Sequence, residues 1–390
     1  MNKEIFYPEI ERLRGVACLL VLFEHITLTA PLLFMREILP LVLYNGRAGM
    51  PLFFVISGFI ITTLLLKRLE QAQTPALFLE RLGMAMIPLK NFFLRRFFRL
   101  MPLAFFNLLI TAGVLFWAYD TDVLPYQTDW EMSFIRTGIE HLFCVYNLII
   151  PQYLATEHLH YGGIGPYWSL SIEGQFYFLW PFVLVLLKTS SRQAIFALCM
   201  CCVGCVIARP AAEFWIEGTS YYHTLCNFDG LFLGSFLALL KTAYVPLPLA
   251  NRGVRFIVPL LILLLWAYPG ICGKNFNACE FIPILGSAGL LVWWASQNRN
   301  IVLGGRIIAS SFEFIGKRSY AIYITQLITA RFSQWIVEAL GLFKTASGER
   351  SDFYSTGQFL VFFTILIVFV EFSHRCIEEP ARRFVRKMTS

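Results

Sequence analysis

Apolar stretches long enough to cross a lipid bilayer recur along this chain of 390 residues. A membrane-spanning helix needs about 17–25 mostly apolar residues, because the hydrocarbon core is about 30 Å thick. Ten stretches approach or reach this length, at 14–34, 50–66, 101–119, 168–187, 193–209, 226–243, 256–272, 282–296, 319–340 and 358–374. They predict an all-α polytopic membrane protein. We expect about ten transmembrane helices around a central cavity, in a single domain over residues 1–390.

The composition supports this class. Hydrophobic residues make up 57% of the chain and charged residues 15%, whereas soluble domains carry about 25% charged residues. Residues 141–155 are apolar but too short to span, so they predict a re-entrant or interfacial segment. The first apolar run is long and no small-residue cleavage site follows it, so we expect an uncleaved first span.

The basic residues predict the orientation. Ten alternating spans with a cytoplasmic N-terminus place 24 of the 32 Lys and Arg residues in cytoplasmic loops and span ends. The opposite side receives the acidic segment 120–131. Both termini are therefore predicted to be cytoplasmic. The net charge of +7 then describes a cytoplasmic surface, and no nucleic-acid partner is expected.

The cysteines are not spaced as the ligands of a metal site usually are. The cluster CMCCVGC (199–205) lies inside an apolar span, where Cys behaves as a small hydrophobic residue. No metal site is expected there. Cys272 and Cys279 flank a predicted outward loop, where an oxidising environment would allow them to pair.

An ionisable pair stands deep in the first predicted span, RLRGVACLLVLFEH (12–25). At 1.5 Å per residue, His25 lies about 16 Å along the helix from Arg14, near the middle of the membrane. A polar group there is costly and marks a functional site by default. The alternative is a His that hydrogen-bonds a neighbouring helix. Glu24 lies about 100° around the helix from His25 and faces another partner.

Arg95, Arg96 and Arg99 begin the third predicted span, in RRFFRLMP (95–102). Arg96 and Arg99 are three residues apart, so they share one helix face and could bind one phosphorylated ligand together. The alternative is anchoring of the span by cytoplasmic basic residues.

Further polar residues lie inside apolar spans. Ser169, Glu173 and Tyr177, each four residues apart, share a helix face, with Trp168 near its outer end. They predict either a site or a polar network that packs helices. The Ser57-Gly58 pair favours close helix packing. Asp229 is another carboxylate within a span.

These segments, in this order, resemble the acyltransferase 3 family of integral membrane O-acyltransferases. The resemblance rests on seven segments: RLRGVACLLVLFEH, LFFVISGFII, LRRFFRLMP, WSLSIEGQFYFLWP, FDGLFLGSFLA, SYAIYITQL and IEEPARR. It implies an enzyme of the bacterial inner membrane that takes an acyl group, usually acetyl, from cytoplasmic acyl-CoA. The group passes to a hydroxyl of a glycan, glycolipid or small natural product. The resemblance implies acyl-CoA as co-substrate and no tightly bound cofactor.

The resemblance also implies roles for single residues. His25 takes the catalytic position and Arg14 is its partner in the first span. Arg96 and Arg99 match the family's Arg-x-x-Arg, which serves the donor. Ser57, Gly58 and Phe59 match the Ser-Gly-Phe signature and are expected to bind the donor. Trp168, Ser169 and Glu173 match the Trp-Ser-Leu-x-x-Glu signature, and Glu173 is expected to be catalytic together with His25. The candidate acceptor or cavity residues are Glu24, Trp168, Ser169, Tyr177, Asp229, Tyr323 and Gln326.

The chain departs from the family pattern at three positions. Gly174 stands where a second Glu is common, Pro51 where an acidic residue is common, and Gln326 where a His is common. These departures concern accessory groups and acceptor choice. Some relatives append an extracytoplasmic esterase-like domain, and we expect none here.

The residues together suggest a mechanism. Donor phosphates would lie among Arg14, Arg96 and Arg99, and the slender pantetheine arm would carry the thioester towards His25. Neutral His25 would act as general base on the acceptor hydroxyl, with Glu173 first and Glu24 second as candidates to orient its ring. An acyl-His intermediate is the competing chemistry.

Two other classes remain open. A transporter would use His25, Glu173 and Asp229 as intramembrane ionisable groups, but it leaves the Arg-x-x-Arg unexplained. A membrane scaffold or export subunit without catalysis leaves the buried His unexplained.

Overall fold

The structure is a computed structural model built almost entirely of helices. It describes residues 6–29, 46–69, 78–120, 138–141, 143–148, 165–186, 192–215, 221–243, 253–272, 278–340 and 354–389. Its elements are α1 (Pro8–Thr29), η1 (Gly46–Ala48), α3 (Gly49–Arg68), α4 (Phe78–Asp120), α7 (Tyr167–Leu186), α8 (Arg192–Trp215), α9 (Thr224–Thr242), α10 (Val254–Cys272), α11 (Ala278–Ala295), α12 (Arg306–Ala339), α13 (Tyr354–Ser373), η3 (His374–Glu378) and α14 (Glu379–Met388).

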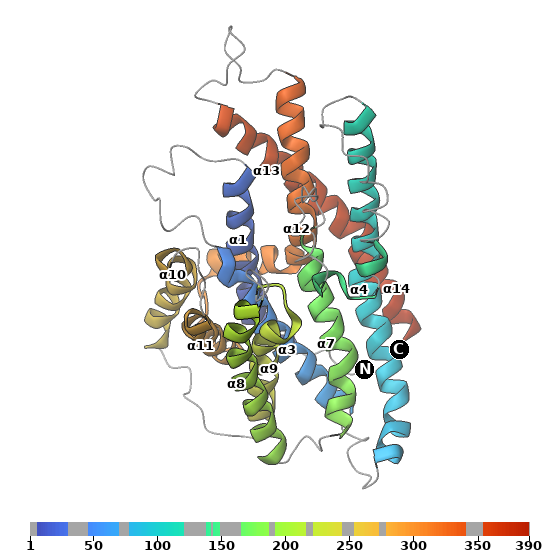
Figure 1. Cartoon of the computed structure of the whole chain (residues 1–390), viewed down its shortest axis with the longest axis vertical. Helices are drawn as coiled ribbons and strands as arrows, with labels where there is room; N and C mark the ends of the chain where they lie inside the picture. The colour runs from blue at the N-terminus through green and yellow to red at the C-terminus, as the bar shows by residue number, and fades with distance from the viewer. Residues whose placement is uncertain are drawn as a thin grey trace.

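Each of the ten predicted spans falls on one of ten long helices, from α1 to α13 (Figure 1). Within the described ranges, four helical segments are long and apolar enough by themselves to cross a membrane: Gly46–Arg68, Tyr167–Leu186, Thr224–Thr242 and Gly357–Met388. Shorter apolar helical stretches lie at Leu198–Arg209, Val254–Tyr268 and Phe281–Ala295. The prediction of an all-α polytopic membrane protein is confirmed.

Two helices extend well beyond their predicted spans. α4 begins at Phe78, before the apolar run at 101–119, and α12 begins at Arg306, before the run at 319–340. These extensions carry charged residues, so a search for continuous apolar sequence does not find them. Because α4 is continuous, with Pro88 and Pro102 inside it, the arginines at 95–99 lie on the same helix as the third span.

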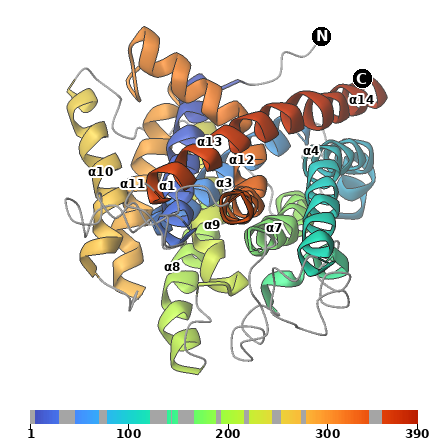
Figure 2. The same ribbon diagram turned by 90° about the horizontal axis from the view of Figure 1, so that it is seen from above.

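The helices gather around a small central group. Seen from above, α1, α3 and α12 lie in the middle of the bundle, with α10 and α11 on one side and α4 and α7 on the other (Figure 2). The central group therefore contributes most of the fully buried side chains, among them Leu13, Leu52, Phe54, Phe59 and Ile324.

α1 and α12 run parallel and very close together. Arg12 donates to Glu313 at 3.0 Å and the Cys18 thiol contacts the Ser319 carbonyl at 3.8 Å, both pairs separated by 301 positions. Glycine makes this approach possible. A Cβ added at Gly316 would lie 1.9 Å from the Glu11 carbonyl oxygen, and one at Gly15 would lie 2.6 Å from the Phe312 carbonyl oxygen. The two backbones are therefore held in one register.

The start of α1 is fixed by a buried carboxylate. Glu9 accepts hydrogen bonds from the backbone N–H groups of Asn300, Ile301 and Val302 at 2.7, 2.8 and 2.7 Å. Arg12 donates to the Asn300 Oδ1 at 2.6 Å. These bonds join α1 to the loop that leads into α12, and charge-assisted bonds of this kind are about twice as strong as neutral ones.

α3 and α9 form a second parallel pair. A Cβ at Gly58 would lie 2.0 Å from the Leu231 carbonyl oxygen, and one at Gly234 would lie 2.0 Å from the Val55 carbonyl oxygen. Thr62 donates to Ser235 at 2.8 Å in the same contact. Gly58 therefore serves close helix packing, which is the alternative that the sequence favoured for the Ser57-Gly58 pair.

The two parallel pairs agree with ten alternating spans. α1 and α12 hold the first and ninth predicted spans, and α3 and α9 hold the second and sixth. Spans with an even difference in number must run in the same direction. Which end is cytoplasmic stays a prediction.

Some predictions fall on parts that the structure does not describe. In the predicted re-entrant segment 141–155, residues 146–148 are helical and 149–155 lie outside the described residues. The side chains of Cys272 and Cys279 and the acidic segment at 121–131 also lie outside them.

We expect Gly316→Ala to destabilise the protein by about 1–3 kcal/mol, because the new methyl group overlaps the Glu11 carbonyl and forces α1 and α12 apart. Thermal unfolding of the purified protein in detergent measures this change. Gly204→Ala in α8 is the matched control, because a Cβ there meets no atom within 4 Å. Equal melting temperatures for the two variants would contradict the close contact.

Candidate active site

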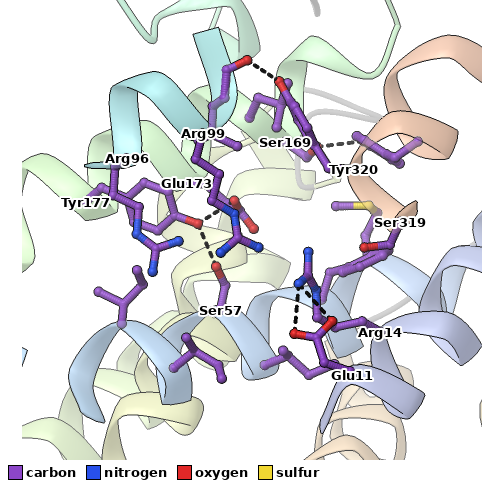
Figure 3. A pocket seen from close by; sticks show the side chains of 18 residues that line it. Glu11, Arg14, Ser57, Arg96, Arg99, Ser169, Glu173, Tyr177, Ser319 and Tyr320 are labelled. Atoms are coloured by element: carbon purple, nitrogen blue, oxygen red, sulfur yellow. Dashed lines mark hydrogen bonds and ion pairs between the residues drawn. The ribbon is translucent and has the colours of Figure 1, made fainter. Parts of the chain in front are cut away.

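A cavity of about 100 Å³ lies between α1, α3, α4, α7 and α12 (Figure 3). Its lining is polar at one end and apolar along its walls. The lining residues are Glu11, Arg14, Met50, Phe53, Ile56, Ser57, Ile60, Ile61, Arg96, Arg99, Leu100, Ser169, Leu170, Glu173, Tyr177, Ser319, Tyr320 and Tyr323. The volume equals that of a few water molecules, so the cavity suits a slender ligand segment.

Three guanidinium groups meet at one end, which we call the arginine end (Arg14, Arg96 and Arg99; Figure 3). Arg14 donates to both carboxylate oxygens of Glu11 at 3.2 Å. The positive charges of Arg14 and Arg96 lie within electrostatic range of Arg99 and repel it.

Arg96 and Arg99 lie within electrostatic range of Glu173 and Glu11, but in the part of the chain that the structure describes no carboxylate forms an ion pair with either of them. Over the described ranges neither side chain forms a hydrogen bond or an ion pair, and Arg96 lies against the rings of Tyr177 and Phe92, 5.3 and 5.8 Å from their centroids. Two half-buried cations that lack a close counter-ion form a site where an anion would be stabilised.

A chain of short hydrogen bonds crosses the cavity above the arginines. The Tyr177 hydroxyl donates to Glu173 at 2.6 Å and lies 2.7 Å from the Ser57 hydroxyl. Because the Tyr177 hydroxyl has a single proton, Ser57 must be the donor of the second bond. The three residues come from α3 and α7, so the predicted Glu173 face is brought together with Ser57.

Another wall of the cavity is built from α7 and α12. Ser169 and Tyr323 share a hydrogen bond of 2.6 Å between their hydroxyl groups. Tyr320, one turn before Tyr323, donates to the Leu100 carbonyl at 2.6 Å and so joins α12 to α4. These bonds fix α12 as the cavity wall that leads away from the arginine end.

Gln326 continues this wall one turn beyond Tyr323, and its side chain lies within interaction range of His25. The pair is again separated by 301 positions, the register that the α1–α12 contact sets. His25 itself is not among the described residues that line the cavity. It stands at the next level along α1 and α12, on the side away from the arginines.

The carboxylates proposed to orient His25 have other partners. Glu173 is bound by Tyr177 inside the cavity, and Glu24 lies 3.8 Å from the guanidinium group of Arg47 in η1. A role for either one beside His25 stays a prediction. The polar group that the structure brings to His25 is an amide, at the position where the family pattern commonly has His.

Several predicted site residues face away from the cavity. Gly58 contacts α9, and the fully buried Phe59 packs against Tyr7 with 5.6 Å between ring centroids. Trp168 packs against Tyr221 and Tyr222 at 5.1 and 5.3 Å. Neighbouring positions on a helix point about 100° apart, so Ser57 lines the cavity while Gly58 and Phe59 do not, whereas Ser169 and Glu173, four residues apart, both line it.

Asp229 lies in a separate buried ion pair. The Arg209 guanidinium donates to its Oδ2 from Nε at 2.9 Å and from Nη2 at 2.7 Å, and the Gly230 N–H donates to its Oδ1 at 2.6 Å. Both side chains are almost fully buried, with 2% and 3% exposed. The pair joins α8 to α9, and its bonds fit a structural role.

The sequence interpretation missed several residues near the arginine end. Glu11 stands three residues before Arg14, a spacing that places the two on one helix face. Ser319 and Tyr320 lie in the SYAIYITQL segment beside the predicted Tyr323. Glu378 and Arg382 lie in IEEPARR, where no role was assigned to single residues.

The fold and the site define a polytopic helical membrane protein with a narrow internal cavity and a cationic end. Residues 7–373 match the model of the acyltransferase domain family, which is most of the chain. The chain therefore belongs to the acyltransferase 3 family, as the resemblance in its sequence indicated. No solved structure gives a significant match.

The curated relatives share about a quarter of the aligned residues with this chain and are longer than it. The chain is 26% identical over 419 residues to a Staphylococcus aureus (strain COL) protein provisionally named an O-acetyltransferase, covering 98% of this chain and 58% of the relative. It is 25% identical over 340 residues to peptidoglycan O-acetyltransferase OatA of Listeria monocytogenes, covering 82% of this chain and 48% of that protein. The chain thus spans about half the length of these relatives.

We expect Asp229→Asn to lower the yield of folded protein, because breaking a buried ion pair costs about 3–5 kcal/mol. The double variant Asp229→Leu, Arg209→Met removes both charges and should restore folding and acyl transfer per folded molecule. Size-exclusion chromatography and transfer assays measure the two quantities. A folded but inactive double variant would instead give Asp229 a part in the reaction.

Proposed function

We propose that this protein is a membrane O-acyltransferase that moves an acyl group, most simply acetyl, from acyl-CoA to a hydroxyl of a cell-envelope glycan or glycolipid. The carrying observation is that two arginines without carboxylate partners, Arg96 and Arg99, form one end of a cavity whose α12 wall leads to His25. Membership of the acyltransferase 3 family supports the reaction class.

The donor would enter at the arginine end. Acyl-CoA has a highly charged nucleotide end and a long, thin, mostly uncharged arm. The phosphates would bind Arg96 and Arg99, whose planar groups match phosphate geometry, while Arg14 and Glu11 form the adjacent wall. The slender arm fits a narrow cavity with apolar walls of Ile56, Ile60 and Ile61.

His25 would then act as general base. It takes the proton of the acceptor hydroxyl as that oxygen forms a bond to the thioester carbonyl carbon. The carbon–sulfur bond breaks, and the departing sulfur receives the proton from His25, so coenzyme A leaves as a thiol. The covalent alternative forms acyl-His25 first and transfers the acyl group to the hydroxyl in a second step.

The surroundings of His25 favour its role as a general base. A general base must be neutral before it acts, and the Gln326 amide carries no charge, so it stabilises an imidazolium less than a carboxylate beside the ring would. Arg47 lies near Glu24 and so offsets the charge of that carboxylate. Direct transfer is therefore the route we propose.

The acceptor would approach from the side away from the arginines. Trp168, Tyr221 and Tyr222 pack together there, and Tyr221 lies within electrostatic range of Glu24. Aromatic rings beside a carboxylate suit a sugar, which has apolar C–H faces and hydroxyl groups. The named peptidoglycan O-acetyltransferase among the relatives supports an envelope glycan. In this arrangement the protein sits in the bacterial inner membrane with both termini cytoplasmic.

The transporter alternative fits less well. A proton relay through His25, Glu173 and Asp229 needs groups that can exchange protons in sequence, whereas Asp229 is bound by Arg209 on another helix pair. Arg96 and Arg99 also have no part in such a relay.

Arg96→Ala and Arg99→Ala should each weaken acetyl-CoA binding about tenfold or more, because a hydrogen bond to a charged group contributes about 1.5–3 kcal/mol. Lys at either position should restore binding only in part, since it lacks the planar fork. Titration calorimetry on the detergent-purified protein measures the affinities. Lys90→Ala is the control, because Lys90 is an exposed cation on the same helix. Unchanged affinity in the double Arg variant would leave these residues as membrane anchors.

His25→Gln and His25→Ala should lower the rate of acyl transfer about 10²–10⁴-fold with donor affinity nearly unchanged, because a general base contributes that much. His223→Gln is the matched control. It changes a histidine that has no part in the proposed reaction and whose ring accepts a hydrogen bond from the Leu225 N–H at the start of α9. Mass spectrometry of an acylated glycan gives the rate. A His25→Ala variant with near wild-type rate would remove His25 from the chemistry, and acylated protein trapped with donor alone would favour the covalent route.

A further inference from the structure

Helical structure continues beyond α13, the last long helix. α13 passes into the π-helical turn His374–Glu378 and then into α14, with Pro380 in the first turn of α14. π-helical turns are rare and often lie at functional sites. This segment carries IEEPARR, for which the proposed reaction gives no role.

α14 is fastened to the helix that carries the donor arginines. Arg95 donates to the Thr389 hydroxyl at 2.7 Å and to the Thr389 carbonyl at 3.1 Å. Phe98 and Phe384 pack with ring centroids 5.4 Å apart. α14 therefore lies beside the Arg95–Arg99 stretch of α4, as the two views of the molecule agree (Figures 1 and 2).

Glu378 links the π-helical turn to α14. Its side chain has 0% of its surface exposed, and it bonds His374 Nδ1 at 3.0 Å through one carboxylate oxygen. Its other oxygen accepts a hydrogen bond from Arg382, one turn along α14. Glu378 thus fixes the position of the Arg382 guanidinium group.

Arg382 lies on α14, which packs against the Arg95–Arg99 stretch of α4. It is not among the residues that line the cavity, but it lies within electrostatic range of Arg96, Arg99 and Glu11, and 23% of its side chain is exposed. Arg383, the next residue, points away, with 75% of its side chain exposed beside Glu379. Both arginines lie near Glu379, at 3.8 Å for Arg382 and 3.5 Å for Arg383, but only Arg382 is largely buried and bound by Glu378.

A fourth cation at the arginine end has a chemical use. The charged end of coenzyme A carries a diphosphate and a separate phosphate on the ribose, so its negative charge is spread over more than one group. Arg96 and Arg99 share one helix face and suit one group. A guanidinium from another element, at a fixed distance from this pair, suits another.

We propose that α14 completes the donor site: Arg382 binds the nucleotide end of acyl-CoA, and Glu378 is the positioning residue that holds Arg382 in place. This inference rests on the proposed function, since it assumes an acyl-CoA donor. It adds a part of the chain beyond the last span to the binding site.

Titration of the full-length protein in detergent with coenzyme A and with adenosine 3′,5′-bisphosphate tests the proposal. Arg382→Ala should weaken binding of both probes about tenfold, the effect of one lost charge-assisted bond. Arg383→Ala removes the same charge from the same helix and should change binding less than about twofold. Arg382→Lys keeps the charge and should fall between Arg382→Ala and wild type.

A variant of Glu378 distinguishes positioning of Arg382 from a simple effect of the Glu378 charge. A nearby negative charge opposes phosphate binding, so its neutralisation should tighten binding if Glu378 acts only by its charge. If it positions Arg382, Glu378→Gln should weaken coenzyme A binding, and the double variant with Arg382→Ala should bind no more weakly than Arg382→Ala alone. Tighter binding by Glu378→Gln would overturn the positioning role.

The outcomes also separate this inference from the proposed function. Wild-type protein that binds neither probe would overturn the acyl-CoA donor and this inference together. Wild-type protein that binds coenzyme A, with Arg382→Ala and Arg383→Ala variants of equal affinity and equal melting temperature, would overturn this inference alone. Donor binding through Arg96 and Arg99 would then stand without α14.

Discussion

The close parallel contact between α1 and α12 is the constraint on which the site depends. Gly15 and Gly316 have no Cβ, so the carbonyl oxygen of the facing helix can occupy the space that a Cβ would take. Glu9 and Arg12 fix the same contact at its start through the loop before α12. Because the register is set there, residues on α12 stand at defined heights opposite α1, and Gln326 comes to lie beside His25.

The polar groups of the cavity form an ordered series along this pair. Glu11 and Arg14 on α1 lie at the level of Arg96 and Arg99 on α4, while Ser57, Glu173 and Tyr177 cross the next level. Tyr323 and Ser169 close the wall, and His25 follows. The arginine end is thus separated from the imidazole by a cavity lined with polar and apolar side chains, and His25 is not among the residues that line it.

Burying charge in such a protein requires close partners, and the structure shows two solutions. Asp229 and Arg209 form a compensated pair inside the bundle, and Glu378 holds both His374 and Arg382 at its edge. Arg96 and Arg99 differ from both, since Glu173 and Glu11 lie within electrostatic range of them but neither arginine forms an ion pair in the described ranges. The Asp229–Arg209 pair stabilises the fold, the Glu378–Arg382 pair holds a guanidinium group in position, and cations without an ion pair mark where a ligand of opposite charge would bind.

The sequence alone determined the class of protein and the helices, because a bilayer demands long apolar segments that can be found in one dimension. It also selected His25, Arg96 and Arg99 as candidate site residues, since a buried ionisable group or two arginines on one face can be recognised from spacing. Only the tertiary structure decided which members of a motif share a cavity: Ser57 lines it, while Gly58 and Phe59 pack elsewhere. It placed Asp229 against Arg209, Gln326 against His25, and Arg382 near Arg99. These pairs join residues distant in sequence, and their meeting depends on helix register, which the fit of glycines and side chains sets in three dimensions.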